Sequence, residues 1–386
     1  FLCRRGQRNS RPEARNSPQQ TEGQKKTTPC GRRPQRKEQE DLKIIVDAMG
    51  GDKAPLEIVK GTLRAVKARP GLEAVLVGRE AEVRKAAAQC GAAQLPKGVR
   101  IVNATEVIGM HDDPATAFKT KKDSSITVGL NLLKNGEGDA FVSAGSTGAL
   151  LSAGTLIVKR VRGIRRAAMA PLVPTAGRGV VLVDCGANAE CTVEYLVQFA
   201  YLGSFYAAKA MGIERPRVAL LNIGSEDSKG DQLRRETYQA LQEAGDGGHL
   251  NFVGNMEAKE AVKGGCDVLV ADGFSGNVML KTIEGVGSFM GGELKRMFLG
   301  SLKTKVAAVL VKDGLRSFKD RLNPDTIGGT PFLGLQKPVI KAHGASSARA
   351  VENAVYQAAA AAEADLAGEI EAHIGLMKLT GPKGEN

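Results

Sequence analysis

Short apolar runs alternate with helix-like stretches along the chain from Leu42 onward. The runs are rich in Val, Ile and Leu and nearly continuous, as in strands that are covered on both faces of a sheet. Strands separated by helices of about a dozen residues are typical of βαβ units. We expect strands at residues 43–46, 74–77, 100–102, 140–142, 180–183, 218–222, 251–253 and 268–271. The pattern predicts an α/β fold with a mostly parallel sheet.

One segment, residues 289–322, has a helical pattern instead. Its large apolar residues lie about four apart, with Lys and Arg between them, as in Met290, Leu294, Phe298, Leu302, Val306 and Leu310. We expect an amphipathic helical hairpin over 287–323, with its two helices joined near Asp313 and Gly314. A basic hairpin of this kind can contact a partner subunit, lie on an anionic membrane, or be a plain surface helix pair. The pattern leaves all three interpretations open.

The first 41 residues differ in composition from the rest. They hold eleven Lys and Arg against five Asp and Glu, which is half of the net charge of +12, and almost no large apolar residues. We expect a disordered basic tail, either a solvated leader or an over-extended start, and not a nucleic-acid partner site. No internal repeat or linker interrupts residues 42–380, which we expect to form a single domain.

The composition indicates an ordinary globular chain, with 42% hydrophobic and 25% charged residues among 386. No apolar run approaches the roughly 18 residues of a membrane-spanning helix. Six scattered cysteines show no disulfide or CxxC spacing, so we expect reduced thiols and a cytoplasmic location.

Five loops rich in Gly and small polar residues follow the expected strands. They are DAMGGD (47–52), SAGSTGA (143–149), DCGANAE (184–190), NIGSEDSKG (222–230) and DGFSGN (272–277). The carboxyl ends of parallel strands share one edge of a sheet, so we expect all five loops to converge there. Glycine lets backbone amides approach an anion, which predicts a phosphate site. Tight packing alone is the alternative explanation.

Several common sites are missing from the sequence. It lacks GxGxxG after the first strand, GxxxxGK[ST] and GxSxG, and it has only four histidines, without metal-ligand spacing. We therefore expect no cofactor and no metal. Cys185 and Cys191 lie in a candidate site loop, but without a nearby base they are better interpreted as small buried residues than as nucleophiles.

The strings LKIIVDAMGGDKAP, SAGSTGALL, VDCGANAE, LLNIGSEDSKG, ADGFSGNVMLKTIEG and KAHGASS resemble, in order and spacing, the phosphate acyltransferases of bacterial phospholipid synthesis. The resemblance runs from about Leu42 to about Leu366. That family makes acyl phosphate from acyl-acyl carrier protein and orthophosphate. Lys53, Ser146 and Glu190 depart from the family pattern, so we expect no obligatory catalytic role for them.

The resemblance implies a three-layer α/β/α sandwich, similar to isocitrate and isopropylmalate dehydrogenases, with a protruding helical hairpin. It also implies a homodimer that attaches peripherally to membrane and passes acyl phosphate to a downstream glycerol-phosphate acyltransferase. It maps a catalytic lysine onto Lys229, and onto Asn277 a group that positions phosphate or the thioester carbonyl. From the residues alone, Lys229 is equally well a solvated lysine, and Asn277 is a turn residue.

Further residues are expected to build the substrate pocket around this pair. They are Asp47, Gly50, Gly51, Gly145, Thr147, Asp184, Asn188, Asp272 and Gly276. Asn188 and Thr147 are equally well helix caps. Three rival functions stand beside this one: a short-chain acyltransferase using coenzyme A, a nicotinamide dehydrogenase of similar fold, and a basic nucleic-acid or membrane-binding protein.

Overall fold

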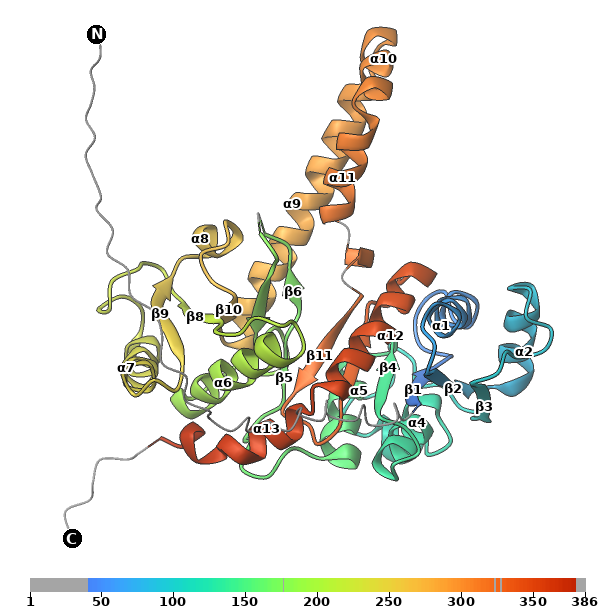
Figure 1. The fold of residues 1–386 in the computed structure, drawn as a ribbon, viewed down its shortest axis with the longest axis horizontal. Coiled ribbons are helices and arrows are strands. Elements are labelled where there is room, and N and C mark those ends of the chain that lie inside the picture. The colour runs from blue at the N-terminus through green and yellow to red at the C-terminus, as the bar shows by residue number, and fades with distance from the viewer. Residues whose placement is uncertain (1–40, 176, 323, 327, 380–386) are drawn as a thin grey trace, which may run out of the picture. The chain divides into compact units, whose positions relative to one another are not determined.

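The structure, a computed structural model, describes residues 41–175, 177–322, 324–326 and 328–379. The tail that we expect to be disordered lies, up to residue 40, outside the described residues. The rest consists of mostly parallel sheets flanked by helices (Figure 1). The predicted α/β fold class is confirmed.

All eight expected strands are present, together with four others that the pattern did not predict. The strands are β1 (Leu42–Asp47), β2 (Leu72–Gly78), β3 (Val99–Asn103), β4 (Ala140–Ser143), β5 (Ala168–Met169), β6 (Leu172–Val173), β7 (Val180–Val183), β8 (Arg217–Leu221), β9 (Asn251–Met256), β10 (Val268–Val270), β11 (Gly329–Leu333) and β12 (Val339–Ala342). The α-helices are α1 (Leu56–Ala68), α2 (Glu80–Gln89), α3 (Ala117–Thr120), α4 (Ser125–Lys134), α5 (Thr147–Ala153), α6 (Val193–Lys209), α7 (Gln232–Asp246), α8 (Ala258–Val262), α9 (Gly273–Leu299), α10 (Leu302–Leu310), α11 (Lys312–Leu322), α12 (Ala348–Glu363) and α13 (Leu366–His373).

A seven-stranded sheet has the order β3-β2-β1-β4-β12-β11-β5. Side chains of β1 alternate between its two faces, as the geometry of a strand requires. Ile44 and Val46 pack in a cluster with α1 and α12, whereas Ile45 packs in another with α4 and α5. Because helices bury both faces, the strand is a continuous apolar run, and this part of the fold has three layers.

A five-stranded sheet has the order β6-β7-β10-β8-β9. It repeats the same arrangement with other helices. Val181 and Val183 of β7 pack with α6 and α7, and Val180 and Leu182 pack with residues of α8 and α9. Figure 1 shows this sheet with its yellow and green strands beside the blue and teal strands of the larger sheet.

The segment 168–173, which contains β5 and β6, joins the two sheets. β5 is antiparallel to β11, and β6 is antiparallel to β7. The backbone N–H of Cys185 donates to the Met169 carbonyl at 3.0 Å, which extends the pairing with β7 back to β5. Since β11 is also antiparallel to β12, the strands β7, β8 and β10 run opposite to β1, β4 and β12.

The helical hairpin is built from the outer part of α9 and from α10 and α11, which return beside it (Figure 1). Its turn lies at Gly300 and Ser301. The Ser301 hydroxyl accepts from the Thr304 backbone N–H at 3.2 Å and the Thr304 hydroxyl accepts from the Ser301 N–H at 3.0 Å, which forms a capping box. Asp313 and Gly314 lie inside α11, so the predicted position of the turn is wrong.

Candidate functional site

Three of the glycine-rich loops follow neighbouring strands of the five-stranded sheet. β10 lies between β7 and β8 and is parallel to both. The loops 184–190, 222–230 and 272–277 therefore leave this sheet at one edge. Lys229, expected to be catalytic, lies in the second of these loops. Asn277, the other residue expected to be catalytic, follows the third strand and lies in α9, because residues 273–277 are already helical.

Asp184 organises the first of the three loops. Its buried carboxylate accepts hydrogen bonds from the backbone N–H groups of Met169 (2.8 Å), Ala187 (3.1 Å) and Asn188 (2.6 Å). Burial raises the pKa of this carboxyl, and the hydrogen bonds oppose that shift. The Asn188 amide donates to Asp184 (3.1 Å) and to the Ala167 carbonyl (2.9 Å). Both residues thus hold the loop in shape.

The first turn of α9 packs directly on this loop. Asp272 precedes the helix, and its carboxylate accepts from the Ser275 N–H at 2.9 Å as an N-cap. A Cβ added at Gly276 would overlap the carbonyl oxygen of Asp184, and one at Gly273 would stand 2.5 Å from that of Asn188. Gly276 is therefore a packing residue that lets the helix approach the loop.

Asn277 is the fifth residue of α9, at the start of its second turn, and is exposed to solvent. It faces the 184–190 loop, because a Cβ added at Gly186 would stand 3.6 Å from the Asn277 Cγ. Among the residues that the structure describes, its amide has no hydrogen-bond partner. The amide is free to donate to a ligand that enters beside this loop.

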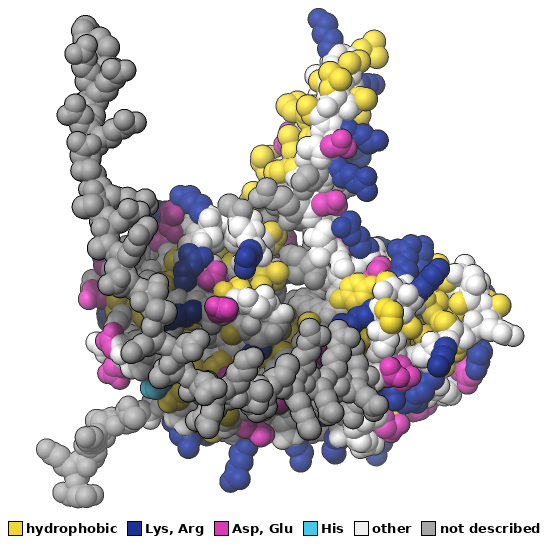
Figure 2. Space-filling model, in the orientation of Figure 1, with side chains coloured by type: hydrophobic (Ala, Val, Ile, Leu, Met, Phe, Trp, Pro, Cys, Tyr) yellow, Lys and Arg dark blue, Asp and Glu magenta, His cyan; other side chains and the backbone are white. Residues whose placement is uncertain are grey.

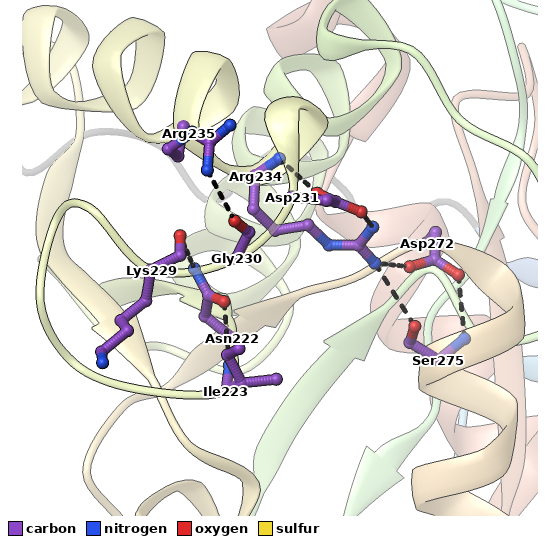
Figure 3. Close-up of polar contacts among 9 residues, drawn as sticks. All are labelled: Asn222, Ile223, Lys229, Gly230, Asp231, Arg234, Arg235, Asp272 and Ser275. Atoms are coloured by element: carbon purple, nitrogen blue, oxygen red, sulfur yellow. Dashed lines mark hydrogen bonds and ion pairs between the residues drawn. The ribbon is translucent and has the colours of Figure 1, made fainter.

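Lys229 lies near the end of the 222–230 loop. Its amine is 3.9 Å from the Glu226 carboxylate, and its side chain is 47% exposed; an exposed pair of this length contributes little. Asn222 closes the loop, donating to the Lys229 carbonyl (3.1 Å) and accepting from the Ile223 N–H (2.8 Å). Figure 3 shows the Lys229 side chain extending away from Arg234. Its charge is therefore available to an anion.

Arg234, which the sequence analysis did not single out, links two of these loops. Its guanidinium donates to Asp231 at 2.8 Å, to Ser275 at 3.3 Å and to Asp272 (Figure 3). The sequence does carry one signal for it: Asp231 and Arg234 have i, i+3 spacing at the start of α7. The sequence carries no such signal for Asp272, which becomes the second acidic partner of Arg234 only in the folded chain.

The other group of loops surrounds Asp47, at the end of β1. Its buried carboxylate accepts from the Ser143 hydroxyl at 2.7 Å and from the Met49 N–H at 3.0 Å. Burial raises the pKa of this carboxyl. Lys341, at the end of β12, donates to the Ala144 carbonyl at 3.3 Å, and burial lowers the pKa of its amine to about 8. Lys341 is a second residue that sequence reasoning missed.

Glycines allow this second group to close. A Cβ at Gly50 would stand 2.6 Å from the Gly145 nitrogen, and one at Gly51 would stand 2.8 Å from the Gly344 carbonyl oxygen. Gly51 also has a φ of 96°, which favours glycine. In these loops the glycines thus allow close backbone packing.

Asn188 and Thr147, for which a helix cap was the alternative to a pocket role, do not occupy cap positions. Ser146 caps α5, and Thr147 is the first residue of that helix. Thr192 caps α6, whereas the Asn188 side chain is bonded to Asp184. The cap interpretation is wrong for both.

The candidate loops form two groups, one at each sheet. The prediction that all five converge at one edge of a single sheet is wrong, because β7, β8 and β10 belong to a separate sheet and run opposite to β1 and β4. Lys229 and Asn277 share an edge of the five-stranded sheet. Of the expected pocket residues, Asp184, Asn188, Asp272 and Gly276 lie at that edge. The others follow β1 and β4 of the seven-stranded sheet: Asp47, Gly50, Gly51, Gly145 and Thr147.

Cysteine chemistry is unfavourable at this site. Burial raises the pKa of both the Cys185 and the Cys191 thiol to about 12, so each is protonated at neutral pH. Across the described ranges, no three His, Cys, Asp or Glu side chains come together as a metal site would require.

A cavity of about 300 Å³ lies away from the Asp47 loops. Leu42, Asp139 and Val339, at the amino ends of β1, β4 and β12, line it together with α13 residues such as Ile370. The Asp47 loops are at the carboxyl ends of those strands.

Comparison with solved structures identifies a shared fold. A phosphotransacetylase from Streptococcus pyogenes superposes with a TM-score of 0.55 and 22% identity, covering 83% of this chain and 94% of that one. The EutD phosphotransacetylase from Staphylococcus aureus superposes with a TM-score of 0.54 and 17% identity, covering 84% of this chain and 95% of that one. At this identity the likeness shows the fold alone.

Sequence comparison goes further. The family described as "Fatty acid synthesis protein" matches residues 42–368. A relative from Thermoanaerobacter pseudethanolicus is 43% identical over 333 residues, which are 86% of this chain and 97% of that protein. A relative from Brevibacillus brevis is 45% identical over 318 residues, which are 82% of this chain and 92% of that protein.

The fold and these matches define an α/β acyltransferase. Both relatives bear the name phosphate acyltransferase, as does one from Lactococcus lactis subsp. cremoris that is 44% identical over 334 residues. The chain belongs to the phosphate acyltransferase family.

Proposed function

We propose that this chain transfers a fatty acyl group from acyl carrier protein to orthophosphate, with Lys229 as the cation that holds phosphate and Asn277 as the donor to the thioester carbonyl. One observation carries the proposal: the neighbouring parallel strands β8 and β10 lead to both residues at one sheet edge. The exposed amine and the unpartnered amide are the two groups that the reaction needs there.

The proposed reaction demands little from a general base. An oxygen of hydrogen phosphate attacks the thioester carbon, the C–S bond breaks, and the proton of the phosphate ends on the departing sulfur. Phosphate is already anionic at neutral pH, and a thiol with a pKa of about 8.5 is a fair leaving group. A positioned amide that stabilises the developing oxyanion is worth about 10²- to 10³-fold in rate.

The test is a thioester assay with a long-chain acyl-acyl carrier protein, with and without orthophosphate. We expect thioester loss and acyl phosphate formation only when phosphate is present. A parallel reaction with acyl-coenzyme A of matched chain length decides the donor. Faster turnover of the coenzyme A thioester would overturn the proposed donor, and phosphate-independent loss would overturn the reaction.

We further propose that the hairpin attaches a cytoplasmic homodimer to the membrane surface, where acyl phosphate is available to a glycerol-phosphate acyltransferase. Figure 2 shows hydrophobic side chains along one side of the hairpin and Lys and Arg along the other. Its exposed apolar residues include Phe289, Met297, Leu302, Val306, Val309 and Leu310. Within the part of the chain that the structure describes, no helix is long and apolar enough to cross a membrane.

A further inference from the structure

The structure ties the loop that carries Lys229 to the helix that carries Asn277. We propose that the Arg234–Asp272 ion pair is a positioning pair that sets the spacing between these two residues. The inference rests on the proposed function, and it assigns Arg234 a role that acts through the placement of Lys229 and Asn277.

Each member of the ion pair is five residues from one of the two proposed catalytic residues. Arg234 lies five residues after Lys229, on the first turn of α7, and Asn277 lies five residues after Asp272, at the start of the second turn of α9. The ion pair between Arg234 and Asp272 therefore joins segment 229–234, which leads into α7, to segment 272–277, which begins α9 (Figure 3). If it is broken, each segment keeps its own helix start but loses its link to the other.

Arginine suits this position better than lysine. Its planar fork reaches Asp231 with one nitrogen and both Asp272 and Ser275 with the other. The Arg234 and Asp272 side chains are only 19% and 8% exposed. An ion pair this well shielded from water holds its geometry more rigidly than an exposed pair.

The sheet itself does not need this link. β8 and β10 are already joined by their backbone ladder. At their amino ends, Arg217 pairs with Asp267 at 3.1 Å in a similar way. The Arg234–Asp272 pair lies beyond the carboxyl ends of β8 and β10, where the backbone ladder has ended and does not hold the loops together. Arg217 thus offers a matched control, because its pair with Asp267 lies at the amino ends of β8 and β10, away from the candidate site.

The test compares Arg234→Gln with Arg217→Gln in the full chain, using phosphate-dependent turnover of acyl-acyl carrier protein. We expect Arg234→Gln to lower kcat at least thirtyfold, while Arg217→Gln stays within threefold of the unsubstituted chain. A merely structural role would change the folded fraction, so turnover is divided by the folded concentration from circular dichroism.

A double-substitution cycle gives the decisive readout. If Arg234 acts by placing Lys229, then adding Arg234→Gln to Lys229→Ala should reduce turnover by less than a further threefold. Multiplicative losses, or an Arg234→Gln enzyme with normal kcat, would overturn the inference. If Arg234→Gln does not fold, Asp272→Asn replaces it, since the asparagine still caps α9.

Different results would refute the proposed function and the positioning role of Arg234. An unsubstituted chain that consumes no thioester with phosphate, or a Lys229→Ala enzyme with normal turnover, refutes the proposed function. An active chain in which Lys229→Ala is impaired and Arg234→Gln is not refutes only the positioning role.

Discussion

At the scale of single residues, Lys341 shows what sequence reasoning does not reach. The string KAHGASS identifies its loop but not its burial, which depends on β12 lying between β4 and β11. Its amine sits near two carboxylates, Asp47 and Asp52, yet burial outweighs their effect and lowers its pKa to about 8. Arg234 was missed for the same reason, since its partner Asp272 is distant in the sequence. Lys229 and Asn277 were selected from the family resemblance.

Lys341 should make stability depend on pH. Between pH 8 and 10.5 the unfolded chain keeps a proton on this amine that the folded chain has lost. The contribution of Lys341 to the free energy of unfolding therefore rises with pH, by about 3 kcal/mol across that window. The free energies of unfolding of the unsubstituted chain and of Lys341→Met, measured by urea unfolding at pH 8 and at pH 10.5, give this contribution. A difference between the two proteins that does not change with pH would refute the burial of this amine.

Gly276 should tolerate no side chain. A Cβ there would overlap backbone of Asp184, so we expect Gly276→Ala to lower the free energy of unfolding by about 1–3 kcal/mol. Gly285 is the control on the same helix, because a Cβ added to it meets nothing within 4 Å. Gly285→Ala should be neutral or stabilising by up to about 1 kcal/mol. Equal effects of the two substitutions in urea unfolding would contradict the packing.

At the scale of elements, the hairpin was predicted with its turn in the wrong place. The sequence KDGL suggests a turn at Asp313 and Gly314, but both are accommodated in α11. The real turn uses Gly300, Ser301 and the Thr304 cap. Threonine at the third helical position is a weaker capping signal than the usual Glu or Gln, which explains the error. The amphipathic pattern itself needed no tertiary information.

Membrane attachment should depend on the charge of α10. The side chains of Lys303 and Lys305 are exposed, and each lysine near an anionic surface contributes about 1 kcal/mol. We expect Lys303→Glu with Lys305→Glu to weaken binding to phosphatidylglycerol vesicles at least tenfold in a flotation assay. The matched control reverses Lys85 and Lys97, exposed lysines far from the hairpin in sequence. Equal binding by both double variants would leave the hairpin without a membrane role.

At the scale of the whole molecule, the long apolar strands were predictable and the path between them was not. β5 and β6 have two residues each, and β11 contains Gly329 and Pro331, which disfavour a strand assignment. If β5, β6 and β11 are not predicted, the sequence gives no sign that the strand direction changes between the two sheets. All five loops are then expected at one edge of a single sheet. The three loops after β7, β8 and β10 do share an edge, because their strands are neighbours and parallel.

The most direct measurement is phosphate-dependent turnover of acyl-acyl carrier protein by Lys229→Ala, with Lys85→Ala as the control for loss of an exposed lysine. We expect Lys229→Ala to lower turnover by at least about 10²-fold with an unchanged circular dichroism spectrum, because the cation that holds phosphate is gone. Lys85→Ala should match the unsubstituted chain. Near-normal turnover by a folded Lys229→Ala enzyme would contradict the central claim.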